Sequence, residues 1–320
     1  MIRQTHILIS WIFTVFTTIS IAQPEIRNSE FNPESRGDNG IRIMFYNVEN
    51  LFDTFDDPAI NDDEFTANGE KNWSYYRYKE KLNHIAKIII AVGGWEAPAL
   101  IGLCEIENFQ VLMDLTTETP LKKYGYHIVH ENSGDLRGID VAIIYRPEKL
   151  VKITHKPINI DDNSFVTRDI LYASFSYQNK DTIHFFINHW PSRYGGKEFS
   201  EKKRVKVASV LRSKTDSLFL ANENPKILIM GDFNDEPSDQ SLAITLSAKP
   251  VTSSIDSKQL YNLNFQDFHS GKGTLVYKEL DHTWFLFDQM IASGAVIEGQ
   301  GILTKGKKNS IFDPEWLLKD

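Results

Sequence analysis

Four apolar stretches of this chain are each followed at once by a polar side chain that can bind a metal ion or a phosphate group. The stretches cover residues 41–46, 99–104, 183–188 and 226–230. The polar residues that follow them are Asn47, Glu105, His189, Asp232 and Asn234. In α/β proteins the ends of strands converge at one edge of the sheet, where ligands bind. We therefore expect these side chains to form one site.

The residue types indicate which chemistry such a site would perform. A carboxylate such as Glu105 suits Mg²⁺, which binds few protein oxygens and keeps several water ligands. His189 and Asn234 can donate hydrogen bonds to phosphate oxygens, and Asp232 can orient or deprotonate a water molecule. The set predicts metal-assisted chemistry on a phosphate group.

Each of these residues also has a purely structural explanation. Glu105 could cap the following helix, His189 could be a structural histidine, and the stretch from Gly231 to Asn234 could be an ordinary turn, since Gly, Asp and Asn favour turns. The same layout at four strand ends favours a shared site over four independent structural roles.

Hydrophobic periodicity predicts the elements that would position this site. We expect strands at residues 41–46, 99–104, 126–130, 139–145, 170–177, 182–188, 226–230 and 287–292, and helices at 74–92, 109–116 and 202–220. This alternation predicts one α/β domain with several antiparallel pairs, and hence two mixed sheets. The acidic segment 53–70 is interpreted as a solvated loop, because it lacks the spacing of an EF-hand calcium loop.

Composition narrows the class of protein. The chain has 320 residues, of which 41% are hydrophobic and 24% charged, which excludes a disordered chain, a collagen-like repeat and a coiled coil. Cys104 is the only cysteine, so an intramolecular disulfide and a zinc cluster of cysteines are excluded. The net charge of −8 argues against a generally basic surface but allows a local basic site.

The N-terminal segment has the pattern of an export signal. Residues 1–22 combine Arg3, an apolar stretch, and small residues before Gln23, as in a cleaved signal peptide. The alternative, a membrane anchor, is disfavoured by the Ser and Thr residues that interrupt the short apolar stretch. We expect a signal peptide (1–22), a linker (23–40) and one domain (41–320). The protein is then periplasmic or secreted, without a stable membrane anchor.

The motifs together resemble the endonuclease/exonuclease/phosphatase superfamily, in particular its deoxyribonuclease-like, exported bacterial members. They occur in the order of that family: Tyr46-Asn47-Val48-Glu49-Asn50, Leu103-Cys104-Glu105, Ile187-Asn188-His189-Trp190-Pro191-Ser192-Arg193, Gly231-Asp232-Phe233-Asn234-Asp235 and Phe287-Asp288-Gln289-Met290-Ile291. The resemblance implies a four-layer sandwich of two mixed β-sheets flanked by helices.

It also implies metal-dependent hydrolysis of a phosphodiester by activated water. In the implied roles, Asn47 organises the site and touches the phosphate, Glu105 binds the metal, and His189 binds or protonates the phosphate. Asp232 positions the nucleophile, and Asn234 supports the transition state. Asp288 stands where the family has a carboxylate that orients a catalytic histidine. We take Glu105, Asn47 and Asp232 as the metal-ligand set, for Mg²⁺ or alternatively Mn²⁺ or Ca²⁺.

Other residues are candidates for contacts with the substrate phosphate. Arg168 resembles an arginine that contacts the phosphate backbone in the deoxyribonuclease branch, and Tyr145 lies in a segment that resembles that branch's DNA-facing region. Arg137 and Arg193 are further candidate phosphate clamps. The basic run at residues 202–206 is interpreted as a solvated helix face rather than a nucleic-acid site.

The sequence departs from the family at its C-terminal end. The family's last strand is preceded by Ser-Asp-His, and no such segment follows Asp288. The pair Asp281-His282 precedes the strand and is interpreted as part of a loop. We expect the last strand to be missing through truncation of the reading frame. The alternative is a branch that uses a different base.

Three functions remain open. The first is an exported, metal-dependent nuclease or phosphodiesterase that acts on nucleic acid as a monomer. The second is a hydrolase of the same fold that acts on a phospholipid or a small phosphoester. The third is a catalytically impaired remnant, because the Asp-His pair is missing.

Overall fold

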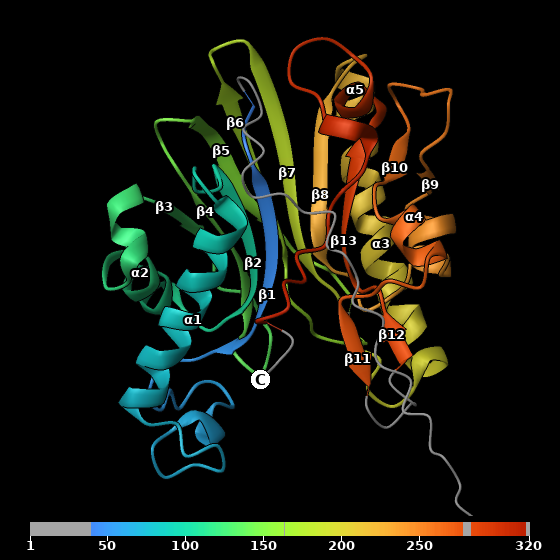
Figure 1. Cartoon of the computed structure of the whole chain (residues 1–320). Helices are drawn as coiled ribbons and strands as arrows, with labels where there is room; N and C mark the ends of the chain where they lie inside the picture. Colours follow the sequence, from blue (N-terminus) through green and yellow to red (C-terminus); the bar gives the residue numbers. More distant parts are fainter. Residues whose placement is uncertain (1–39, 163, 278–282, 318–320) are drawn as a thin grey trace, which may run out of the picture.

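The computed structural model describes residues 40–162, 164–277 and 283–317. Two large β-sheets pack face to face, and helices cover the outer face of each (Figure 1). This is the four-layer α/β sandwich that the sequence predicts. The expected signal peptide, and all but the last residue of the expected linker, lie outside the described residues, as does the pair Asp281-His282.

The first sheet has four strands in the order β1-β2-β4-β3. Their bounds are β1 Ile43–Leu51, β2 Leu100–Ile106, β3 His127–His130 and β4 Asp140–Tyr145. β1 and β2 are parallel, whereas β4 is antiparallel to both of its neighbours. The carboxyl ends of β1 and β2 therefore lie at the same edge.

The second sheet has seven strands in the order β5-β6-β7-β8-β13-β10-β9. Their bounds are β5 Leu150–Ile158, β6 Ile170–Tyr177, β7 Asp181–His189, β8 Lys226–Asp232, β9 Ala248–Pro250, β10 Leu260–Asn262 and β13 Asp288–Ser293. A small hairpin, β11 Leu275–Tyr277 with β12 Thr283–Phe285, stands apart from it. Of these elements, the sequence analysis did not predict β5, β9, β10 and the hairpin.

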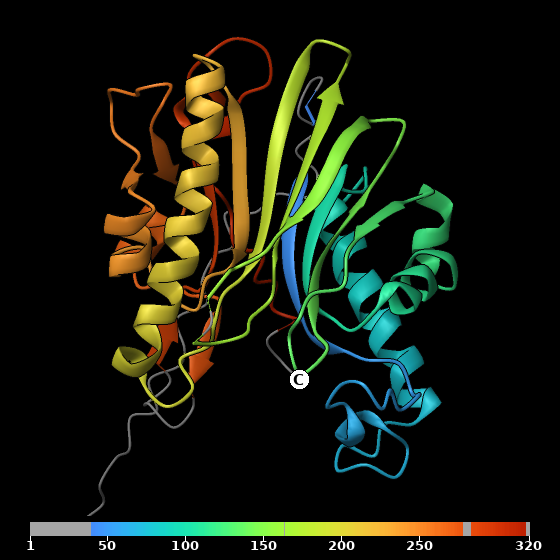
Figure 2. The same cartoon turned by 180° about the vertical axis from the view of Figure 1, so that it is seen from behind.

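The longer helices lie on the two outer faces (Figures 1 and 2), whereas residues of α5 pack into the core between the sheets. α1 and α2 cover the first sheet, and α3 and the short π-helical turn η3 cover the second. The bounds are α1 Tyr75–Gly93, α2 Phe109–Thr117, α3 Lys197–Ala221, η3 Gln240–Thr245, α4 Phe265–His269 and α5 Gly294–Ile297. Three short 3₁₀ turns complete the set: Asp63–Phe65, Pro120–Tyr124 and Lys305–Lys307.

The helix over the first sheet follows directly from its sequence. Ser74 caps α1 by accepting a hydrogen bond from the backbone N–H of Arg77, which satisfies one of the free donors of the first turn. The buried positions Leu82, Ile85 and Ile89 recur at helical spacing and face the sheet. This packing also fixes the position of Lys81, which lies at the edge of the buried face, relative to β1.

Apolar side chains fill the three spaces between the four layers. One core lies between the first sheet and α1 and α2, one between the two sheets, and one between the second sheet and α3. Within the described part of the chain, no helix is both long and apolar enough to span a bilayer.

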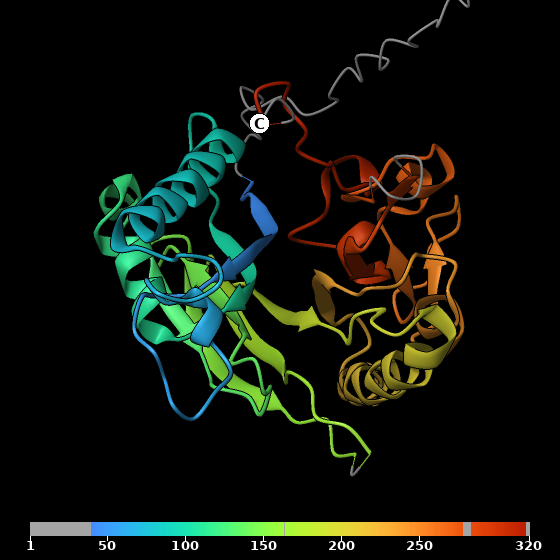
Figure 3. The same ribbon diagram turned by 90° about the horizontal axis from the view of Figure 1, so that it is seen from below.

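The segment after α5 crosses from the second sheet to the first (Figure 3). The backbone N–H of Thr304 donates to Val296, and that of Asn309 donates to Leu263, on the side of the second sheet. Further on, Phe312 and Leu317 pack against the core below α1. Among described residues 294–317, no strand follows β13.

Candidate active site

Three neighbouring strands of the second sheet bring three of the predicted side chains to one level. His189 pairs with Asp232 across β7 and β8, and Asp232 pairs with Asp288 across β8 and β13. Directly paired residues project from the same face of a sheet and lie side by side. At this edge of the sheet the imidazole of His189 therefore lies beside the carboxyl group of Asp232, and Asp288 lies on the other side of Asp232.

Asn47 connects this group to the first sheet. Its Nδ2 lies 3.2 Å from Oε1 of Glu105 and 3.1 Å from Oδ2 of Asp232, and its Oδ1 accepts a hydrogen bond from the backbone N–H of Glu49 at 2.9 Å. The amide nitrogen, rather than the oxygen, therefore points between the carboxylates. This orientation suits the predicted organising role of Asn47 and does not suit its predicted role as a metal ligand.

Two β-bulges aim the side chains of the first sheet. The register shifts between Asn47 and Leu51 in β1, and between Cys104 and Ile106 in β2. Glu105 has a φ of 63°, a left-handed conformation that costs free energy in a residue other than glycine. A bulge re-aims a side chain without ending the strand. The prediction that β1 and β2 end before Asn47 and Glu105 was therefore wrong, because the strands continue through the site.

His189 is buried among charged groups. Its Nε2 lies 3.8 Å from Oε1 of Glu105 and 4.0 Å from Oδ2 of Asp232. Burial lowers the pKa of His189 well below its ordinary value, and the positive charges of Arg168 and Arg137 lower it further. The imidazole is therefore neutral near pH 7, and its buried Nδ1 has no hydrogen-bond partner among the described residues.

Asp232 and Asn234 form a tight turn after β8. Oδ1 of Asp232 accepts the backbone N–H of Asn234 at 2.9 Å, and Nδ2 of Asn234 donates to the carbonyl oxygen of Trp190 at 3.1 Å. Burial, with the nearby negative charge of Glu105, raises the pKa of Asp232 to about 6 despite the hydrogen bonds that it accepts. Asp232 is therefore mainly ionised at pH 7.

Asp288 lies beside Asp232 as its cross-strand partner. Burial raises the pKa of Asp288 well above its ordinary value, and the charge of Asp232 raises it further. The backbone N–H of Asp288 donates to Oγ1 of Thr274 at 3.1 Å, and its buried Oδ1 has no hydrogen-bond partner among the described residues. Within the same part of the chain, no histidine is bonded to this carboxyl group.

Arg137 is the one predicted phosphate clamp that reaches the cleft. Seven of the predicted residues line a single cleft: Asn47, Glu105, Arg137, His189, Asp232, Asn234 and Asp288. The side chain of Arg137 is half exposed, with Asp135 3.7 Å from its Nε. It is therefore free to turn toward an anion in the cleft.

Arg168 is a positioning residue rather than a phosphate clamp. Its Nε donates to the carbonyl of His189 at 3.2 Å and its Nη2 to that of Trp190 at 2.7 Å, while Nη1 lies 2.9 Å from Oδ2 of Asp135. The guanidinium is buried, and these acceptors occupy each of its nitrogens. The prediction of a substrate contact was wrong because the protein itself uses the donors.

Arg193 also serves the protein. Its Nε donates to the backbone carbonyl of Asn234 at 2.9 Å, and its Nη2 lies 2.7 Å from Oδ2 of Asp239 and 3.4 Å from Oδ1 of Asp235. The guanidinium lies over the ring of Phe287, 4.5 Å from its centroid. It therefore holds the turn that carries Asn234, and the prediction that it clamps substrate was wrong.

Tyr145 is far from the site. β4 runs antiparallel to β2, so Asp140 pairs with Ile106 near the site and Tyr145 pairs with Leu100 at the other end. Five residues of strand span roughly 17 Å. Tyr145 packs edge-on against Phe175, with ring centroids 4.8 Å apart, in the core between the sheets. The prediction that it contacts substrate was wrong because strand direction reverses its position.

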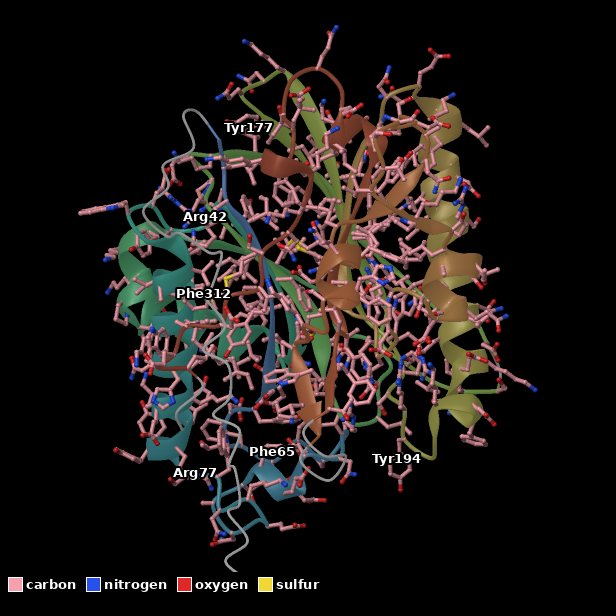
Figure 4. The ribbon with its side chains drawn as sticks, turned by 45° about the vertical axis from the view of Figure 1, so that its right-hand side comes forward. Arg42, Phe65, Arg77, Tyr177, Tyr194 and Phe312 are labelled. Carbon is pink, nitrogen blue, oxygen red and sulfur yellow. The ribbon has the colours of Figure 1, made fainter. Side chains whose placement is uncertain are left out.

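The aromatic residues of the loop after β7 have opposite environments. Trp190 is only 1% exposed and packs edge-on against Phe233. Tyr194 is 90% exposed and points outward at the lower edge of the molecule (Figure 4). Trp190 thus supports the loop, whereas Tyr194 is available to a ligand.

The oxygen atoms of the site fit a divalent cation. Glu105 and Asp232 both approach Nδ2 of Asn47, so their carboxylates face one another across the cleft. Mg²⁺ binds through one or two carboxylates and keeps several water ligands. Among the described residues, no group of three or more His, Cys, Asp and Glu side chains forms a metal cage. Glu105 and Asp232 would therefore be the protein ligands, with water and substrate at the other positions.

Lys81 is a cleft residue that the sequence analysis missed. It comes from α1, lines the same cleft, and donates from Nζ to the carbonyl oxygen of Glu49 at 2.9 Å. Helical periodicity identifies the buried face of α1 but carries no information on what a polar residue at the edge of that face approaches. Only the packing of α1 against β1 brings this lysine to the site.

A comparison with protein families matches residues 42–320 to the Endonuclease/Exonuclease/phosphatase family. The chain belongs to this family. Its members are hydrolases, and the motifs that carry the resemblance are the ones that meet in the cleft. No curated protein matches the chain in a sequence comparison.

Solved structures of the endonuclease/exonuclease/phosphatase family share the fold at low sequence identity. The catalytic domain of human Nocturnin is 15% identical, with 79% of this chain and 82% of that chain covered and a TM-score of 0.52. Humanised TDP2 of D. rerio is 13% identical, with 84% and 90% covered and a TM-score of 0.53. The mannosyl-6-phosphatase Bt3783 of Bacteroides thetaiotaomicron is 16% identical, with 79% and 85% covered and a TM-score of 0.52.

Proposed function

We propose that this protein is an exported, divalent-metal-dependent hydrolase that cleaves phosphodiester bonds in nucleic acid. The observation that carries the proposal is that Glu105 and Asp232, from different sheets, both contact Nδ2 of Asn47 and both lie within 4.0 Å of Nε2 of His189. Export is proposed from the sequence of residues 1–22 alone.

The residues of the cleft would have the following roles in hydrolysis. A divalent ion held by Glu105 and Asp232 would neutralise charge that develops on the phosphoryl oxygens. Asp232, ionised above about pH 6, would orient the attacking water and accept its proton. Neutral His189 would donate a hydrogen bond to a phosphate oxygen from its Nε2.

A second candidate is a phosphomonoesterase that acts on a small phosphorylated sugar. Bt3783, a mannosyl-6-phosphatase by name, shares the fold over 79% of this chain. An open cleft with one half-exposed arginine, Arg137, would also accept a single phosphate group. A phospholipid remains a third substrate class for the same chemistry.

The experiment is a cleavage assay with and without Mg²⁺ and chelator. The substrates are plasmid DNA, a single-stranded oligonucleotide, mannose 6-phosphate and a phospholipid vesicle. We expect Mg²⁺-dependent cleavage of nucleic acid that Glu105→Gln abolishes and the matched exposed change Glu118→Gln leaves intact. Cleavage of the sugar phosphate alone would establish the second candidate instead. Activity that survives Glu105→Gln would overturn the proposed site.

A further inference from the structure

Lys81 is a cation whose ammonium group makes few polar contacts with the described residues. Its ammonium group has three N–H donors, and the carbonyl of Glu49 accepts one of them at 2.9 Å. Among the described residues, no carboxylate forms an ion pair with it, although most other basic residues near the cleft are paired. Lys81 also lines the cleft that holds the candidate active site.

The position of Lys81 relative to the carboxylates is well defined. Glu49, whose carbonyl it holds, is a bulge residue with a φ of 55°, and the N–H of Glu49 is held in turn by Oδ1 of Asn47. The bulge is thus fixed from both sides. Burial lowers the pKa of Lys81, and the negative charges of Glu49 and Glu105 act in the opposite direction. The hydrogen bond from Nζ of Lys81 to the carbonyl of Glu49 thus fixes the ammonium group beside the bulge that follows Asn47.

Arg137 is a second cation that lines the same cleft. It comes from the loop before β4 and is half exposed, whereas Lys81 comes from helix α1. The cleft that holds Glu105 and Asp232 therefore receives cations from two different elements. A polyanion bound in the cleft would have both cations available to it.

We propose that Lys81 is a substrate-binding residue that contacts a phosphate oxygen on the β1 side of the cleft. This inference rests on the proposed function for the identity of the polyanion, but the anion site itself can be tested without hydrolysis. A partly desolvated ammonium without a carboxylate partner gains strongly from a charged acceptor. Lys81 would therefore add affinity and a preference for substrates with a second phosphate.

The test measures anion binding by the whole protein in the presence of chelator, so that no cleavage occurs. Inorganic phosphate is titrated by calorimetry, and a fluorescent single-stranded oligonucleotide is titrated by anisotropy over a range of KCl concentrations. We expect Lys81→Met and Lys81→Gln each to weaken both about tenfold. Because one phosphate contact is lost, the salt dependence of oligonucleotide affinity should also fall by about 0.7 in log–log slope.

The control variants separate charge from structure. Lys81→Arg keeps the charge and should keep the affinity and the salt slope, whereas Lys81→Gln can still donate to Glu49 and should not. Lys87→Met changes an exposed lysine on the same helix and should change neither quantity. Unchanged binding in Lys81→Met, binding restored by glutamine, or no phosphate binding by the wild-type protein would each overturn the proposal.

The two proposals fail in distinguishable ways. If the cleavage assay is negative but phosphate binding depends on the charge at position 81, the anion site stands and the proposed reaction falls. If Glu105→Gln abolishes cleavage while Lys81→Met binds phosphate and oligonucleotide like the wild type, the reaction stands and the anion site falls.

Discussion

Asp232 and Asp288 are direct cross-strand partners in the antiparallel pair of β8 and β13. Two carboxyl groups on directly paired residues repel each other when both are ionised, and burial makes ionisation of both still less favourable. Their environments separate them: Asp232 accepts hydrogen bonds from Asn47 and Asn234, whereas Oδ1 of Asp288 has no partner among the described residues. The pair therefore carries one negative charge near neutral pH, on Asp232.

This pairing predicts that Asp288→Asn stabilises the protein at neutral and alkaline pH. The folded-state pKa of Asp288 lies well above its ordinary value of 3.8, so the folded state retains a proton that the unfolded chain releases. The stability from this group is complete below about pH 4 and is lost as pH rises through the folded-state pKa. An asparagine does not titrate and avoids that loss.

The measurement is the thermal midpoint of both proteins between pH 4 and pH 9. We expect equal midpoints near pH 4 and a variant that is higher by a few degrees at pH 8. Asp56→Asn, an exposed control, should show no difference that grows with pH. A midpoint difference for Asp288→Asn that is constant across this range would mean that the carboxyl is not buried as described.

The ion pair of Asp235 and Arg204 should be a large contributor to the rigidity of the site. Nε of Arg204 lies 2.8 Å from Oδ1 of Asp235, and both side chains are fully buried. Asp235 follows Asn234 directly, and Nε2 of Gln289 donates to its backbone carbonyl at 2.7 Å. Asp235→Asn would leave a buried guanidinium with no neutralising charge from this partner, at a cost of about 3–5 kcal/mol.

Urea denaturation would measure this loss as a lower midpoint with an unchanged slope. Because much of the cost is the unpaired charge, the double variant Asp235→Asn/Arg204→Met should be more stable than the single one. A double variant as unstable as the sum of both single changes would show that the two residues act independently.

The amino-acid sequence alone predicted which side chains meet and on which class of fold. Apolar strands that end in polar residues converge in α/β sandwiches, so the strand pattern was enough to place Glu105, His189, Asp232 and Asn234 together. The strand ends were less well predicted. Bulges at Glu49 and Glu105 keep β1 and β2 running through the site, and a bulge has no reliable signal in hydrophobic patterning.

The three arginines that the sequence predicts to contact substrate show what residue type alone does not reveal. Arg137, Arg168 and Arg193 look alike in sequence, because each lies in a polar segment near a motif. Whether an arginine is free depends on which carboxylates and carbonyls the fold brings to it, and these come from distant segments such as Asp135 and Asp239. The same reason explains why Lys81, which lies far from every motif, was not identified.

The different environments of Arg168 and Arg137 predict that substitutions at the two positions affect different quantities. Arg168→Met removes the donors to the His189 and Trp190 carbonyls and leaves Asp135 without its closest cation. We expect a loss of about 3–5 kcal/mol in stability and a lower kcat. Arg137→Met should leave stability within about 0.5 kcal/mol and raise KM about tenfold, since a half-exposed arginine contributes only to substrate binding.

Steady-state kinetics and thermal denaturation of both variants would separate these effects. Arg168→Lys should recover part of the stability but little of kcat, because a lysine cannot bond both carbonyls and Asp135 in a fixed plane. A rise in KM with unchanged stability in Arg168→Met would instead support the direct phosphate contact that the sequence predicts for this residue.

Metal binding by Glu105 and Asp232 predicts a stability change that does not depend on substrate. A ligand that binds only the folded state at 100 times its Kd stabilises it by about 2.7 kcal/mol, which corresponds to about 5–10 °C in a domain of this size. We expect Mg²⁺ to raise the thermal midpoint by this amount and chelator to reverse it. Glu105→Gln should remove most of the shift, because it leaves Asp232 as the only carboxylate at the position. Glu118→Gln, an exposed change, should keep it. A shift of equal size in Glu105→Gln would place the cation elsewhere, and a wild-type protein without any shift would argue against resident Mg²⁺ in this cleft.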